Sequence, residues 1–350
     1  MEKAVKITIG RRVVSGDGHC FIIAEAGVNH NGDVGLAKKL VDAAKAAGAD
    51  AIKFQTFKAE DLVGKNTEMA DYQKKNTGKK GSQLKMLKKL ELDYKDFIRL
   101  KKYCDKKKII FLSTPHTEDA ADFLEPLVSA YKIASGDLIN LPFLEKVAKK
   151  KKPIILSTGM ATLNEVREAV KAIKNQGNNT IILLHCTTNY PCPLEGVNLR
   201  AMLTLKKELG LPVGYSDHTS GIIVSTIAAA IGAVVIEKHF TLNKNLPGPD
   251  HKASIEPDEL KEMVEAIKNT EKIIGSGEKK PTDSEKKIMQ VVRKSIVAKI
   301  DISKGTKITK NMLVIKRPGI GIKPKYLNKI IGRRAKRNIK KDELITWNIV

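Results

Sequence analysis

Short apolar segments alternate with amphipathic segments over the first 275 residues of the chain. The apolar segments are seven or eight residues long and rich in Ile, Val and Leu, as expected of buried parallel strands. They are FIIAEAG (21–27), DAIKFQT (50–56), IIFLSTP (109–115), YKIASGD (131–137), PIILSTG (153–159), TIILLHCT (180–187), PVGYSDH (212–218) and AVVIEKHF (233–240). Helical spacing of apolar residues separates them, for example at 34–49, 163–177 and 257–275.

This alternation predicts an α/β fold of the (β/α)₈ TIM-barrel type. Eight strands, each followed by a helix over about 250 residues, match that barrel. A doubly wound open sheet is the alternative. The number of strands and the lack of a GxGxxG motif after the first of them favour the barrel.

The ends of the chain differ from this pattern. VKITIGRRVV (5–14) predicts a hairpin that closes the bottom of the barrel, so residues 1–280 form a barrel domain with an N-terminal hairpin. Residues 57–93 make a long polar connection, which is either a lid or disordered. Residues 281–290 are polar and rich in turn formers, which predicts a linker, and 291–350 have short β-like runs typical of a small, mainly β domain.

The composition is that of a soluble globular protein, with 42% hydrophobic and 29% charged residues. The start of the chain lacks a secretory signal, and the apolar run 221–236 is shorter than the ~20 residues of a membrane span. The four cysteines are scattered and predict reduced thiols rather than a disulfide framework. We therefore expect a cytoplasmic protein with no membrane partner.

The formal net charge of +24 raises the question of a nucleic-acid or anionic-membrane partner. Lysine runs at 106–108 and 149–152 follow predicted helices, where cations interact favourably with the helix dipole. Arginine is scarce beside lysine and aromatic residues are only 5%. We predict a solvated lysine-rich surface and no nucleic-acid partner, with a positive field that also attracts a small anionic substrate.

Polar residues stand at the end of nearly every predicted strand, where TIM barrels carry their active sites. The strand period of two places Lys53 with Gln55 on one face, and likewise Ser216 with His218 and Glu237 with His239. Lys238 then points outward among the helices. The strand-end residues are Glu25, Lys53, Gln55, Ser113, Thr114, Lys132, Ser135, Asp137, Ser157, Thr158, His185, Ser216, His218, Glu237 and His239.

These residues sort by chemistry. Lys53 and Lys132 with several hydroxyls suit an anion such as phosphate or carboxylate. His218 and His239 end adjacent strands and suit a divalent metal with open positions, and such a ligand set is compatible with Mn²⁺, Fe²⁺, Co²⁺ or Zn²⁺. A metal of this kind could polarise a carbonyl as a Lewis acid. The remaining pair, Glu25 and Glu237, could act as acid–base groups or as partners of the metal ligands.

The motifs also resemble those of a known family. AEAGVNHNG, IKFQT, FLSTP, YKIASGD, ILSTGM, HCTTNYP, GYSDHTSG, EKHF and GPDHKAS, in this order, resemble the sialic acid (N-acetylneuraminate) synthase family. The tail VIKRPGIGI resembles the antifreeze-like (SAF) domain that follows the barrel in that family. The resemblance covers almost the whole chain.

The resemblance implies condensation of phosphoenolpyruvate with N-acetylmannosamine or a related acetamido sugar, giving a nine-carbon 2-keto acid and phosphate. Phosphoenolpyruvate would be held by Lys53, Thr114, Lys132, Ser135, Ser157 and Ser216. The sugar would contact Gln55, Asp137, Tyr190, Asp250 and Arg317, the last from the second subunit of a domain-exchanged homodimer. His218 and His239 would bind the metal, Mn²⁺ in this family, and the catalytic groups would be Glu25, Glu237 and His239.

Several alternatives stay open at this point. Asp137 and Thr188 replace the Glu and Asn of some family members, so a 2,4-diacetamido-trideoxy hexose, leading to N,N'-diacetyllegionaminate, is a second acceptor. A pyruvate-dependent aldolase, using a metal or a lysine Schiff base, is a second enzyme class. A basic protein that binds nucleic acid or ice is a third hypothesis, and the barrel motifs give it no support.

Overall fold

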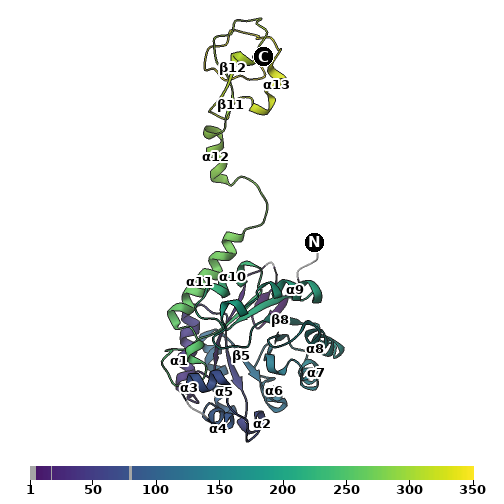
Figure 1. Ribbon diagram of the computed structural model, residues 1–350, viewed down its shortest axis with the longest axis vertical. Coiled ribbons are helices and arrows are strands. Elements are labelled where there is room, and N and C mark those ends of the chain that lie inside the picture. The colour runs from purple at the N-terminus through teal and green to yellow at the C-terminus, as the bar shows by residue number, and fades with distance from the viewer. Residues whose placement is uncertain (1–4, 17, 79–80) are drawn as a thin grey trace. The chain divides into compact units, whose positions relative to one another are not determined.

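The computed structural model of the protein describes residues 5–16, 18–78 and 81–350. The chain divides into two compact units, with the boundary between Gly275 and Ser276. Figure 1 shows the helices and strands of both units.

The first unit is built on eight parallel strands within the described residues. The strands are β3 (Phe21–Gly27), β4 (Ala51–Thr56), β5 (Ile110–Pro115), β6 (Tyr131–Ile133), β7 (Ile154–Ser157), β8 (Ile181–His185), β9 (Val213–Asp217) and β10 (Val235–His239). Their order in the sheet is β5-β4-β3-β10-β9-β8-β7-β6, and the outermost strands β5 and β6 lie in contact. The sheet thus forms a nearly closed barrel, which confirms the predicted fold.

A helix follows each strand and covers the outside of the barrel (Figure 1). These helices are α1 (Val34–Ala47), α5 (Tyr94–Lys107), α6 (Glu118–Leu124), α7 (Leu141–Lys149), α8 (Leu163–Asn175), α9 (Arg200–Leu209), α10 (Ile223–Ala230) and α11 (Pro257–Ile274). Local chemistry fixes their ends. Asp33 caps the start of α1 by accepting from the backbone N–H of Gly35 and Leu36, and Gly48 ends it with a φ of 85°.

Two apolar layers hold the barrel together. One lies between the outer face of the strands and the helices and includes Leu40, Ile52 and Leu183. The other fills the interior and includes Ile23, Leu112 and residues of the N-terminal hairpin, β1 (Ile7–Ile9) and β2 (Arg12–Val14). The hairpin therefore packs against the bottom of the barrel.

The connection 57–93 is not structureless in its described part, which omits residues 79 and 80. It contains the short helices α2 (Ala59–Leu62), α3 (Asp71–Thr77) and α4 (Gln83–Lys88). Asn76 of α3 donates a 2.7 Å hydrogen bond to the carbonyl of Pro249, in the loop after β10. The segment is thus held next to the carboxyl end of the barrel.

The second unit contains a helix where the sequence predicted an irregular linker. Helix α12 (Asp283–Val292) covers most of the segment 281–290, and its start is a capping box between Thr282 and Glu285. A small body follows, with antiparallel strands β11 (Ser295–Ala298) and β12 (Leu313–Lys316), isolated β-bridges and helix α13 (Leu327–Ile330). Its apolar core includes Ile296, Ile330 and Ile345.

Single-turn 3₁₀ helices complete the described secondary structure. They are η1 (Ser135–Asp137), η2 (Leu194–Gly196), η3 (His251–Ala253), η4 (Lys310–Met312) and η5 (Pro324–Tyr326). Among the residues that the structure describes, no helix combines the length and the apolar character that crossing a membrane requires.

Candidate active site

A cavity of about 130 Å³ lies at the carboxyl ends of the barrel strands. It collects most of the side chains that the sequence predicted. Those lining it are Glu25, Lys53, Gln55, Thr114, Lys132, Ser135, Ser157, Tyr190, Ser216, His218, Glu237 and His239. Asp137, in η1, is not among the lining residues, but it follows the lining residue Gly136 directly in the chain. In contrast, Arg317 belongs to the second unit.

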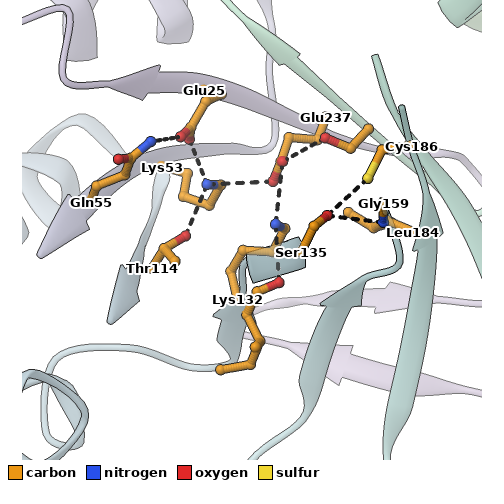
Figure 2. Close-up of polar contacts among 12 residues, drawn as sticks. Glu25, Lys53, Gln55, Thr114, Lys132, Ser135, Gly159, Leu184, Cys186 and Glu237 are labelled. Carbon is orange, nitrogen blue, oxygen red and sulfur yellow. Dashed lines mark hydrogen bonds and ion pairs between the residues drawn. The ribbon is translucent and has the colours of Figure 1, made fainter. Parts of the chain in front are cut away.

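Two lysines and two glutamates form a buried ionic network in the cavity (Figure 2). Lys53 Nζ lies 2.8 Å from Glu25 Oε2 and 3.7 Å from Glu237 Oε2. Lys132 Nζ lies 3.5 Å from Glu237 Oε1. The hydroxyl of Thr114 accepts from Lys53 at 3.0 Å. All four charged side chains are at most 5% exposed, so their charges act on one another in a low-dielectric environment.

The two carboxyl groups have opposite pKa shifts. Burial raises the pKa of Glu25 to about 7, and this outweighs its pairing with Lys53. Burial alone would raise the pKa of Glu237 as well. Lys132, Lys53 and the 2.9 Å hydrogen bond from Ser216 outweigh burial and lower the pKa of that carboxyl to about 2. Glu237 is therefore a permanent carboxylate near neutral pH, while Glu25 can hold or release a proton there.

The pKa values of the two lysines are also shifted in opposite directions. Burial alone would lower the pKa of Lys53, but Glu237 and Glu25 together raise that pKa above its ordinary value. Burial lowers the pKa of Lys132, which has Glu237 as its main counter-charge. Lys53 therefore stays a cation.

The imidazoles of His218 and His239 face one another at the same rim, with ring centroids 5.9 Å apart. His218 Nδ1 lies 2.7 Å from the carbonyl oxygen of Thr187 and must be the protonated nitrogen, which leaves a lone pair on Nε2. His239 Nδ1 is buried and has no hydrogen-bond partner among the described residues. Burial lowers the pKa of both rings, to about 4 for His218, so both are neutral at pH 7.

These two rings fit a divalent metal ion that takes further ligands from outside the protein. Neutral imidazole with an available lone pair is the ligand form that such ions require. Within the described ranges no cluster of three or more His, Cys, Asp or Glu side chains is arranged to hold a metal. The remaining coordination positions would therefore fall to water or substrate oxygens.

A backbone irregularity brings the acidic and metal-binding halves together. The register of β3 against β4 shifts between Glu25 and Gly27, and Gly27 has a φ of 52°. A Cβ at Gly27 would lie 3.3 Å from both Glu25 Oε1 and His239 Cε1. Glycine thus allows the strand to turn without filling the space between these side chains.

Aromatic side chains cover the imidazole side of the cavity. The ring of Tyr190 packs 4.2 Å from His218 and 5.7 Å from His239, measured between centroids. Tyr72 of α3 packs on the other side of Tyr190 at 5.0 Å. Burial raises the pKa of both tyrosines, and the nearby carboxylate of Asp250 raises it further. The 57–93 segment therefore contributes directly to this wall.

The structure also shows residues at the cavity that the sequence prediction missed. His116 lines it, and Cys186 Sγ lies 3.2 Å from Ser135 Oγ. Thr188, whose identity departs from that of some family members, lines it as well. His185, by contrast, is outside the cavity, because its Nε2 bonds to the carbonyl of Val197 at 2.8 Å. The alternation of β8 carried a signal for this, because Ile182 and Leu184 face the barrel interior and Cys186 continues that face.

The comparisons with known proteins agree with this fold. A model of the NeuB family matches residues 40–279 and a model of the SAF domain matches residues 293–350. The chain belongs to the NeuB family, which confirms the resemblance to sialic acid synthases.

Three relatives define the similarity further. N,N'-diacetyllegionaminic acid synthase of Legionella pneumophila is 51% identical over 333 residues, covering 94% of each chain. The protein of the same name from Campylobacter jejuni is 51% identical over 93% of this chain and 98% of its own. The crystal structure of N-acetylneuraminic acid (sialic acid) synthetase from Leptospira borgpetersenii is 38% identical, with a TM-score of 0.74 over 82% of this chain and 95% of that one.

Proposed function

We propose that this protein condenses phosphoenolpyruvate with the open-chain aldehyde of an N-acetylated amino sugar, giving a nonulosonic acid and phosphate. The supporting observation is that one buried cavity holds Lys53 and Lys132 beside the neutral imidazoles of His218 and His239. The lysines supply charge for an anion and the imidazoles supply ligands for a metal. A reaction between an enol phosphate and an aldehyde can use positive charge to bind the phosphate and a metal to activate the aldehyde.

Phosphoenolpyruvate would lie at the base of the cavity. Lys53 and Lys132 offset its negative charge, and the hydroxyls of Thr114, Ser135, Ser157 and Ser216 supply uncharged donors around them. Ser135 is already oriented, since it accepts from the backbone N–H of Gly159 at 3.0 Å. Fixed donors of this kind cost little reorganisation when charge moves during a reaction.

The metal would be held by His218 and His239, and we propose Mn²⁺ as the ion. When bound, such an ion supplies Lewis-acid activation of the sugar aldehyde. The hydrogen bond from His218 to Thr187 fixes the tautomer and the ring orientation needed for ligation. Tyr190 packs against both rings and limits their movement.

Glu25 would move the proton that the reaction needs. The methylene carbon of phosphoenolpyruvate forms a bond to the aldehyde carbon, and the resulting cationic centre at C2 accepts water. The C2–O bond to phosphate then breaks. Glu25 either protonates the new alkoxide or takes the proton from that water, and a pKa of about 7 permits both states at neutral pH. Glu237, which stays ionised, balances the charge of Lys53 and Lys132.

The acceptor sugar would lie above this site, against Gln55, Asp137, Tyr190 and Asp250. We propose a 2,4-diacetamido-trideoxy hexose as the preferred acceptor rather than N-acetylmannosamine, because relatives named N,N'-diacetyllegionaminic acid synthase are 51% identical to the chain. Arg317 would reach the sugar from the second subunit of a domain-exchanged homodimer. We place this reaction in the cytoplasm.

The test is phosphate release from phosphoenolpyruvate with a panel of acylated amino sugars, each with and without Mn²⁺. We expect release only when both an N-acetylated mannose-type sugar and a divalent ion are present. Failure with every such sugar would overturn the proposal. Borohydride trapping with free pyruvate tests the Schiff-base alternative, in which the reacting amine would be Lys132, whose pKa burial lowers, rather than Lys53, whose pKa is raised.

A further inference from the structure

His116 is an imidazole at the cavity wall that the proposed reaction does not use. It follows β5, two residues after Thr114, and lines the cavity on the side of η1. Its backbone N–H donates to the carbonyl of Thr56 at 3.2 Å, and its ring packs edge-on against the buried ring of Phe57, with centroids 6.1 Å apart. The ring is therefore held in one orientation.

The partners of its two nitrogens differ. His116 Nδ1 lies 3.8 Å from Asp137 Oδ2, whereas the buried Nε2 atom has no hydrogen-bond partner in the part of the chain that the structure describes. Burial, with Lys53 and Lys132 nearby, lowers the pKa of His116 to about 4, so the ring is neutral at pH 7. Burial raises the pKa of Asp137 to about 6, so it is mainly a carboxylate at that pH.

These facts decide what the wall can bind. At 3.8 Å the carboxylate of Asp137 is too far for a direct hydrogen bond, but its negative charge favours the single N–H of the neutral ring on Nδ1, which lies toward it. Nε2 is then an acceptor. A buried acceptor without a partner is costly, and a ligand that donates a hydrogen bond to it gains the free energy that is otherwise lost. Because Nε2 and the carboxylate both accept, the wall favours a donor.

We propose that His116 and Asp137 form a specificity site for one hydrogen-bond-donating substituent of the acceptor sugar, an N–H or O–H group distinct from the reacting aldehyde. This inference rests on the proposed function and names the chemistry by which the same cavity selects its sugar. His116 is the specificity-determining residue, with Nε2 as the contacting atom. The charge of Asp137 favours this tautomer, and its carboxylate extends the accepting surface.

The test couples changes in the protein to changes in the sugar. The full chain and its His116→Phe variant are assayed for kcat/KM with the best acceptor and with analogues that each lack one N–H or O–H donor. At one position, loss of the donor should lower kcat/KM by about 10- to 100-fold in the parent protein but less than about 3-fold in His116→Phe. The KM for phosphoenolpyruvate should stay within about 3-fold.

Matched variants separate recognition from folding. His116→Gln restores an acceptor and should recover part of the discrimination, and Asp137→Asn should weaken it. His19→Phe changes an exposed imidazole that pairs with Glu271, and should leave the discrimination unchanged. If the loss of each donor changes kcat/KM by the same factor in the parent and in His116→Phe, the inference is overturned.

Failure of the proposed function gives a different result. If the parent protein releases no phosphate with any sugar, the condensation itself is wrong. Calorimetric binding of the same sugars to the parent and to His116→Phe then decides the inference. A donor-dependent difference in Kd that His116→Phe abolishes supports it, and no sugar binding, or equal Kd values in both proteins, overturns it.

Discussion

Two buried lysine–carboxylate groups lie back to back in this barrel. They differ in how many of their polar side-chain atoms have hydrogen-bond partners within the protein. Glu237 faces the cavity with Lys53 and Lys132, whereas the next residue, Lys238, faces the helices and pairs with Asp217 at 3.0 Å. Both groups are shielded from water. One strand thus carries a buried ionic group on each face.

In the outward group, Lys238 and both carboxylate oxygens of Asp217 have hydrogen-bond partners within the protein. Lys238 also donates to the carbonyl of Thr219, and Asp217 accepts from the backbone and hydroxyl of Thr219 and, at 2.6 Å, from Ser225. In the cavity, by contrast, Glu25 Oε2 and Glu237 Oε2 are ion-paired but make no hydrogen bond of good geometry to any described residue. A buried polar group whose hydrogen bonds are all made within the protein stabilises the fold. A buried polar group that lacks some of these partners can form them with a ligand.

Removing the lysine of the outward group should have the largest effect on stability. Lys238→Met leaves Asp217 as a buried charge without its cation, and should lower the free energy of unfolding by about 3–5 kcal/mol. Denaturant unfolding measures this loss. The double variant Lys238→Met/Asp217→Leu should recover part of it, because no charge is then left without a partner. A single variant as stable as the parent would contradict the distinction between the two groups.

The corresponding change in the cavity should affect activity instead. Lys53→Met removes a cation that we propose to bind phosphoenolpyruvate, and should lower kcat/KM by about 10³-fold. The melting temperature should change little, because Glu25 already has a pKa near 7 and can take up a proton. Phosphate release and thermal unfolding of the same sample measure both effects. A large loss of stability with normal activity would reverse the comparison.

The imidazoles provide a third, smaller difference. His218→Asn and His239→Asn should each lower kcat by about 10²-fold and weaken Mn²⁺ binding, which electron paramagnetic resonance measures without turnover. His185→Asn is the matched control, since that ring bonds to Val197 outside the cavity. Unchanged Mn²⁺ affinity in both active-site variants would show that the metal, if bound, lies elsewhere.

The pH dependence of stability should show the smallest effect. Burial raises the pKa of Glu25 from 4.5 to about 7, so the stability that its protonated form contributes is complete below pH 4.5 and is lost as pH rises through 7. Glu25→Gln cannot ionise, so its melting temperature should rise relative to the parent between pH 5 and pH 8. Glu237→Gln should show no such trend, because the pKa of Glu237 is lowered to about 2 and that carboxyl stays ionised throughout.

The sequence predicted the barrel because buried parallel strands leave a clear apolar signal. It predicted most of the cavity because the carboxyl ends of such strands converge. The sequence prediction missed His116 and misplaced His185, because the alternation along β5 and β8, and not the chemical type of a strand-end residue, decides which side chains face the cavity. Ile110 and Leu112 face the interior, and the same face leads through Thr114 to His116.

Other features required the folded chain. Asp137 was placed in a strand, but β6 ends at Ile133 and Asp137 lies in a 3₁₀ turn whose position depends on its neighbours. Helix α12 replaced part of a predicted irregular linker, although Thr282 and Glu285 form the capping pair that marks a helix start. The pKa of Glu25 depends on burial and three-dimensional neighbours, which one-dimensional patterns do not contain.

The network of two lysines and two glutamates has a consequence for substrate entry. With Glu25 ionised the four side chains have no net charge, so the arriving trianion of phosphoenolpyruvate would meet a neutral site. Protonation of Glu25 would leave one surplus cation. Substrate entry at neutral pH should therefore draw protons from the solvent, and the heat of binding should vary with the ionisation enthalpy of the buffer.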